Sequence, residues 1–149
     1  NPPQVCEMEG REDLQGVYFY SPRHVQGAIA ICQDNAINSD EVQWTANDLD
    51  TLRHEAFHYL QDCIGGLDGD MNQYFDGPGG ISPDDGTYEE VWMALSVMNI
   101  NPYDIINRYI DMGADELTVK LELEAFMVAA MSISGADIAE LVQDSCPIP

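Results

Sequence analysis

The segment His54-Glu55-Ala56-Phe57-His58 constrains this chain more than any other feature of its sequence. Residues four apart lie on one face of an α-helix, so both imidazoles can reach one metal ion at about 2.0–2.1 Å. Glu55 lies about a third of a turn away, where its carboxylate can accept a proton from a water on that ion. The pattern H-E-x-x-H therefore predicts a helix that carries a catalytic zinc site.

The sequence around this motif is that of an amphipathic helix. Thr45 or Asn47 can cap its start, and two glycines end it at about Ile64. The residues that lie nearly opposite the histidines form an apolar stripe at helical spacing, namely Leu49, Leu52, Ala56 and Leu60. We expect one side of this helix to pack into the core while the other side lines a cleft.

The rest of the chain predicts a single α+β domain over residues 1–149, with residues 1–13 as an N-terminal arm. Two β-branched and aromatic runs, 17–21 and 25–32, predict a small antiparallel sheet. Capping signals and apolar spacing then predict helices over about 87–98, 102–112, 114–133 and 134–145. The expected architecture is an early sheet followed mostly by helices.

The charge of the chain limits its partners. It contains 27 acidic and 5 basic residues, for a net charge of −22. Such a field repels phosphate backbones and anionic lipids, which argues against nucleic-acid and polybasic membrane roles, and it favours cationic partners and divalent metals. No apolar run approaches the ~18 residues that a membrane-spanning helix needs.

Four cysteines form an even set without a C-x-x-C motif: Cys6, Cys32, Cys63 and Cys146. Two disulfides in a secreted or otherwise extracytoplasmic protein are the favoured interpretation, and four thiols in a cytoplasmic protein are the alternative. The start at Asn1 rather than methionine suggests that a signal or pro-segment precedes this chain. Of the three pairings, we expect Cys32–Cys63 and Cys6–Cys146.

A catalytic zinc needs a third protein ligand. Gln61 and Ile64 stand where the metzincin pattern has its glycine and third histidine, so we expect a downstream carboxylate instead. Glu122 is preferred because it lies in an apolar helix, where an unpaired carboxylate is costly, among small neighbours that allow close helix packing. Glu124 is the main alternative, and the acids at 89 and 90 and in the loop over residues 65–86 stay open.

These motifs resemble those of the gluzincin zinc metallopeptidases, in particular the small minigluzincins, through HEAFH followed downstream by Glu122-x-x-Ala125. More locally, residues 27–35 and 52–63 are similar to the small mitochondrial intermembrane-space metallopeptidases, which also have a cysteine-ended strand before HExxH and a cysteine soon after it. The resemblance implies a zincin fold, with an edge strand of the sheet beside the cleft, and peptide-bond hydrolysis. In one respect the sequence departs from several gluzincin families, because Phe126 stands where they have an aspartate that braces a histidine.

The resemblance also implies roles for further residues. Glu55 would act as general base, and Tyr103 or Tyr109 would stabilise the oxyanion. Helical spacing places Asp62 one turn beyond His58, where it could hydrogen-bond the free ring nitrogen of that residue; a solvated acid at the end of the helix is the alternative. The edge strand would hold an extended peptide or protein substrate through Ala28, Ile29, Ala30 and Ile31.

Two other interpretations stay open. The chain could be a non-catalytic, metal-stabilised binding or adhesion module in which zinc is structural or vestigial. A second metal signal lies in a glycine- and aspartate-rich loop, which copies the first half of a calcium-binding loop but lacks its glycine and its final glutamate. The candidate calcium ligands there are Asp68, Asp70, Asn72 and Asp76.

Overall fold

The computed structural model of the chain combines helices with a small two-stranded antiparallel sheet, which confirms the α+β class. It describes residues 4–7, 14–19, 28–33, 43–65, 71, 93, 95–131 and 134–146. A short 3-10 helix, η1 (Gln4–Glu7), precedes the sheet. The α-helices are α1 (Ala46–Gly65), α3 (Pro102–Asp111), α4 (Glu116–Ala130) and α5 (Gly135–Ser145).

The sheet consists of β1 (Gly16–Phe19) and β2 (Ala28–Ile31), which pair with Gly16 opposite Ile31 and Phe19 opposite Ala28. One further bond, from the Cys32 N–H to the Gln15 carbonyl at 2.7 Å, continues the ladder. This bond makes Gln15 and Cys32 a hydrogen-bonded pair. Hydrogen-bonded and non-hydrogen-bonded pairs alternate along an antiparallel ladder, so Gly16 and Tyr18 belong to non-hydrogen-bonded pairs. Their backbone N–H and C=O groups therefore point away from β2. Both strands fall within the runs predicted from the sequence.

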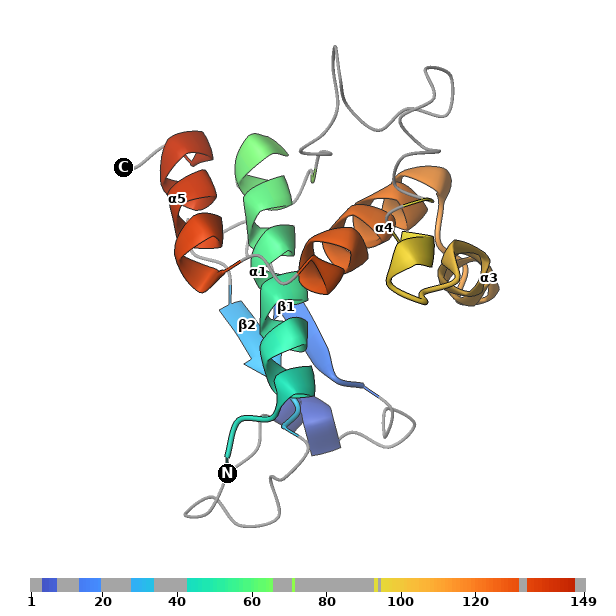
Figure 1. Ribbon diagram of the computed structural model, residues 1–149, viewed down its shortest axis with the longest axis horizontal. Coiled ribbons are helices and arrows are strands. Elements are labelled where there is room, and N and C mark those ends of the chain that lie inside the picture. Colours follow the sequence, from blue (N-terminus) through green and yellow to red (C-terminus); the bar gives the residue numbers. More distant parts are fainter. Residues whose placement is uncertain are drawn as a thin grey trace.

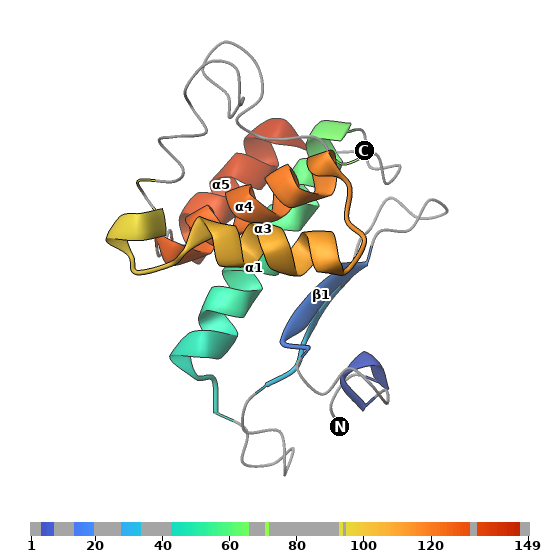
Figure 2. The same ribbon diagram turned by 90° about the vertical axis from the view of Figure 1, so that its right-hand side faces the viewer.

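Helix α1 is the central element of the fold (Figure 1). Thr45 caps it, because its hydroxyl accepts the Asp48 N–H and the Asp48 carboxylate accepts the Thr45 N–H. The two strands and helices α4 and α5 all pack against α1. The other face of α4 contacts α3, which lies across it in Figure 2.

Each of the three later helices begins at a capping residue that the sequence contains. Asn101 caps α3 ahead of Pro102, Asp115 caps α4, and Ser134 forms a reciprocal capping box with Asp137 at α5. Within the segment predicted as a helix over 87–98, the described residues 93 and 95–97 are helical.

Helix α4 is buried on two sides. One apolar cluster joins it to α3, and a second joins it to α1 and α5. The first cluster contains Leu95, Ile105, Val119, Leu123 and Met127. The second contains Phe57, Leu60, Ala125, Val128 and Ile138. An acid in this helix is therefore held within the protein interior, where it requires polar partners.

The chain forms two disulfides, but their pairing differs from the one expected from the sequence. Cys6 pairs with Cys32, and Cys63 pairs with Cys146. The predicted Cys32–Cys63 and Cys6–Cys146 pairing is wrong because β2 ends beside η1, whereas the C-terminal end of α1 lies beside the end of α5. Two disulfides are typical of an oxidising compartment. Among the described helices, none is long and apolar enough to cross a membrane.

Candidate metal centre

The middle turns of α1 direct three polar side chains of the HEAFH segment into the protein rather than into solvent. His54, Glu55 and His58 are all buried, with between 7% and 9% of their surface exposed. The apolar side of the same helix contributes Phe57 and Leu60 to the core. The helical spacing thus separates a core side from a polar side, as the sequence predicts.

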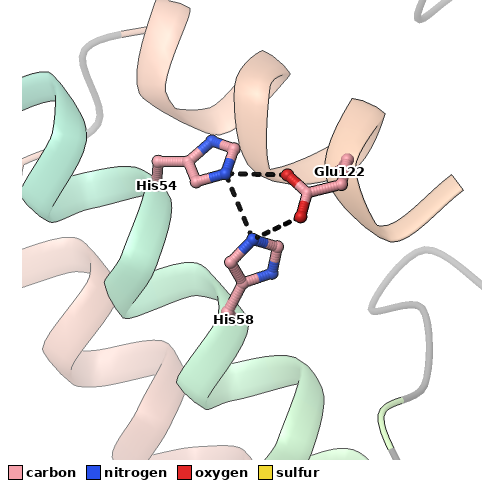
Figure 3. Close-up of side chains that lie close together, drawn as sticks. All are labelled: His54, His58 and Glu122. Carbon is pink, nitrogen blue, oxygen red and sulfur yellow. Dashed lines mark hydrogen bonds and ion pairs between the residues drawn. The ribbon is translucent and has the colours of Figure 1, made fainter. Parts of the chain in front are cut away.

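Two helices bring three ligand atoms together (Figure 3). His54 Nε2 lies 2.9 Å from Glu122 Oε2, and His58 Nε2 lies 3.3 Å from Glu122 Oε1. The two Nε2 atoms are 3.1 Å apart. One ligand atom from each side chain lies within 4.8 Å of the others, so the group could hold a metal ion. The preferred third ligand, Glu122, is therefore the acid that α4 presents to the histidines.

The donor set and its spacing fit a zinc ion. Ligand atoms bound tetrahedrally at about 2.0–2.1 Å are about 3.3–3.4 Å apart, and the observed separations of 2.9–3.3 Å are close to this value. Two imidazoles and one carboxylate are also a ligand set that catalytic zinc uses, with a further position left for water. In the described part of the chain, no fourth side chain joins this group.

The electrostatics of the group suit a cation. Burial opposes the ionisation of Glu122, but the hydrogen bonds and charges of His54 and His58 outweigh it and hold its pKa well below the usual value. Burial likewise opposes the charged form of His58, yet contact with Glu122 raises its pKa. A carboxylate that stays ionised between two ring nitrogens is an attractive position for a divalent ion.

The outer nitrogen of His58 is held by a residue that the sequence analysis did not identify. His58 Nδ1 lies 2.7 Å from Gln61 Oε1. Gln61 Nε2 in turn donates to the Leu121 carbonyl at 3.0 Å and to Glu124 Oε1 at 2.9 Å. The prediction that Asp62 braces His58 is therefore wrong, and Glu124, the alternative ligand, contacts Gln61 instead of completing the ligand group.

Asp62 has a different partner because it points from α1 toward the sheet. It accepts a hydrogen bond from the Tyr18 hydroxyl at 2.6 Å, which links α1 to β1. Tyr18 also packs edge-on against Tyr59 of α1, with ring centroids 6.0 Å apart. This acid thus fixes the position of the strand relative to the helix.

Glu55 lies at the contact between α1 and β1. A Cβ added at Gly16 would meet Glu55 Cγ at 3.0 Å and Thr51 Cγ2 at 2.6 Å, so only glycine allows the strand to approach this closely. The Tyr18 backbone N–H forms a hydrogen bond to the Glu55 carboxylate. Burial raises the pKa of Glu55, while the neighbouring His54 and His58 rings oppose this change.

A cleft of about 320 Å³ reaches the site at His54 and Glu55. Gly16 at the start of β1 and the two residues before it line the cleft, and the four residues of β2, Ala28 to Ile31, are not among its lining. The strand beside the cleft is therefore β1, which corrects the expectation that β2 borders it. The opposite wall includes Arg108 and Tyr109 of α3 and Phe126 of α4.

The two candidate tyrosines have different positions. Tyr109 lines the cleft, and its hydroxyl hydrogen-bonds to Glu122; burial and the charge of Glu122 raise its pKa. Tyr103 is 59% exposed and is absent from the cleft lining. Phe126 packs edge-on against the His54 ring, with centroids 4.5 Å apart. The His54 ring is therefore held partly by an aromatic contact with α4.

Other sequence candidates lie outside the described residues. These are the calcium candidates Asp68, Asp70, Asn72 and Asp76, and the acids Glu89 and Glu90. Arg108 in the cleft wall was missed because no motif singles out one arginine before the fold is known. Comparison with protein-family models, curated proteins and solved structures found no match to this chain.

Proposed function

We propose that this protein is a zinc-dependent metalloendopeptidase of the gluzincin type, with a zincin-like fold and an extracytoplasmic location. The observation that carries the proposal is the convergence of His54, His58 and Glu122 beside Glu55 at the end of a cleft. The two disulfides support the location. A zinc ion held by the three ligands would activate a water and polarise the scissile carbonyl.

Glu55 is the group that moves the proton. Its carboxylate would take a proton from the attacking water and return it to the leaving amine. A general base works best when its pKa lies near the working pH, and burial moves the pKa of Glu55 in that direction. The Tyr18 N–H holds the carboxylate in place on the side of β1.

Tyr109 is the group best placed to stabilise negative charge on the substrate. Its hydroxyl lies at the cleft wall and keeps its proton, because its pKa is raised. A phenol that donates to the oxygen of the attacked carbonyl would be an oxyanion-stabilising group. We assign this role to Tyr109 rather than to the exposed Tyr103.

The substrate would be an extended peptide segment that lies along the start of β1. Gly16 directs its backbone groups away from β2 and lies in the cleft lining. Free backbone groups on a strand edge bind an extended peptide through main-chain hydrogen bonds. The narrow cleft suits one or two side chains of such a segment rather than a folded domain.

The decisive experiment combines metal analysis with cleavage of a mixed peptide library. We expect the wild type to contain one zinc and to cleave peptides, and a chelator to abolish cleavage. Glu55→Gln should retain zinc and lose about a hundredfold to ten-thousandfold in activity, because only the proton acceptor is removed.

The matched control is Glu140→Gln, which removes a carboxylate from the exposed side of α5 and should leave activity unchanged. A zinc-loaded wild type that cleaves no peptide under broad conditions would refute the peptidase and favour a non-catalytic binding module. Full activity in Glu55→Gln would refute only the role of Glu55 as general base and would leave the rest of the proposed function standing.

A further inference from the structure

A chain of buried hydrogen bonds runs from α4 to the outer nitrogen of His58. Glu124 is fully buried and accepts from Gln61 Nε2 at 2.9 Å, and the Leu121 carbonyl accepts from the same nitrogen at 3.0 Å. The other end of the Gln61 amide, Oε1, faces His58 Nδ1 at 2.7 Å. Gln61 itself is fully buried.

The two acceptors on α4 decide which way round the Gln61 amide lies. A carboxylate and a carbonyl both require the NH₂ end, which has two hydrogens to donate. The opposite orientation would place the amide oxygen against the Leu121 and Glu124 oxygens and lose both hydrogen bonds that Gln61 donates, a costly arrangement. Glu124 and the Leu121 carbonyl therefore fix Oε1 toward His58.

The orientation of Gln61 in turn decides the tautomer of His58. An amide oxygen only accepts, so His58 must carry a proton on Nδ1 in order to bond to it. Neutral His58 then has its lone pair on Nε2, which is the atom that faces His54 and Glu122. A metal ligand needs this deprotonated nitrogen.

We propose that Gln61 and Glu124 are positioning residues of the metal centre, which act in series to hold His58 in the tautomer and orientation that bind the metal. This inference rests on the metal site of the proposed function but not on peptidase activity. Neither residue is a ligand: the ligand group contains only His54, His58 and Glu122.

The test measures zinc affinity by competition with a chromophoric chelator in a double-mutant cycle. Gln61→Met keeps a similar length without hydrogen bonds, and we expect it to weaken zinc binding by about 10–100-fold. Glu124→Gln replaces a carboxylate that can only accept with an amide that can also donate, so the Gln61 amide is no longer fixed in one orientation, and binding should weaken by about tenfold. In the Gln61→Met background, Glu124→Gln should weaken zinc binding no further, because the proposed effect of Glu124 on His58 passes through the Gln61 amide.

The absorption of the cobalt-substituted protein gives a second readout that a general loss of stability would not change. The ligand-field bands should shift in both single variants, because His58 would be oriented differently from its position in the wild type. Thermal unfolding would show that both variants are folded. The matched control is Glu116→Gln, which removes the same charge from the same helix at a side chain with 79% exposure. It should change neither affinity nor spectrum.

Four outcomes separate the possibilities. Unchanged affinity and spectrum in Gln61→Met or Glu124→Gln overturn the inference. An equal loss from Glu124→Gln in both backgrounds also overturns it, since that result indicates a through-space charge effect. A wild type that binds zinc without cleaving peptides refutes the proposed function and leaves the inference standing if the cycle behaves as expected. A wild type that binds neither metal refutes both.

Discussion

At the level of single residues, Gly16 shows how close packing can position Glu55, the proposed general base. Any side chain there would press on Thr51 and Glu55, whose atoms lie between 2.6 and 3.1 Å from the added Cβ. Thr51 is β-branched and has little rotamer freedom in a helix, so it cannot move aside cheaply. The absence of a side chain at Gly16 is therefore part of what holds Glu55 against β1.

We predict that Gly16→Ala lowers the free energy of unfolding by about 1–3 kcal/mol through overpacking. It should also lower the rate of peptide cleavage, because the strand must withdraw from Glu55. The control is Gly135→Ala at the start of α5, where an added Cβ meets nothing within 4 Å. That change should leave activity intact and raise stability by up to about 1 kcal/mol. Denaturant unfolding and cleavage assays on both variants would test this, and equal behaviour of the two would contradict it.

A residue's role could be predicted from the sequence where it depends on neighbours within a helical turn or two, and not where it depends on partners far along the chain. His54 and His58 follow from local helical spacing, and Glu122 follows from the cost of an acid in an apolar helix. The role of Gln61 could not be predicted, because the two α4 acceptors that orient its amide lie 60 and 63 positions further along the chain. Asp62 was assigned its role from helical spacing alone, which does not reveal that the Tyr18 hydroxyl lies within reach.

At the level of secondary-structure elements, the helices were predicted well because each has a capping residue and an apolar stripe. Thr45, Asn101 and Ser134 occupy the predicted starts. Which strand borders the cleft was not predictable, because both runs are apolar and only packing against α1 distinguishes them. The disulfide pairing failed for the same reason, since it depends on which element ends meet.

The two disulfides should contribute differently to stability. The Cys63–Cys146 pair spans 83 positions and the Cys6–Cys32 pair spans 26. From loop-closure entropy, the first is expected to stabilise by about 4.5 kcal/mol and the second by about 3.5 kcal/mol. We therefore predict that Cys63→Ala/Cys146→Ala unfolds at a lower denaturant concentration than Cys6→Ala/Cys32→Ala. The reverse order in urea titrations would show that local packing outweighs chain entropy.

At the level of the whole molecule, the metal centre joins the two main helices of the core. Its ligands come from α1 and α4, which also share the apolar cluster around Phe57 and Val128. An ion that binds only the folded chain stabilises it by mass action. Binding of an ion at this candidate site would therefore be linked to the stability of the fold.

We predict that zinc at about a hundred times its Kd adds about 2.7 kcal/mol to the free energy of unfolding. For a chain of this size, this corresponds to a rise in Tm of about 5–10 °C, and chelation should reverse it. The control is Glu122→Gln, which keeps the shape of the ligand but removes its charge, and its Tm should respond much less to zinc. A Tm that is independent of zinc in the wild type, measured by calorimetry, would contradict a folded-state zinc site.

The disulfides divide the chain into two covalently closed rings that follow one another without overlap, from Cys6 to Cys32 and from Cys63 to Cys146. A backbone nick inside either ring leaves the fragments joined, whereas a nick between Cys32 and Cys63 releases them. Since Cys63 lies in the last turn of α1, a nick between Cys63 and Glu122 leaves His54 and His58 tethered to the fragment that carries Glu122. Such a nicked protein would migrate as one species until it is reduced, and it would keep all three metal ligands in one molecule.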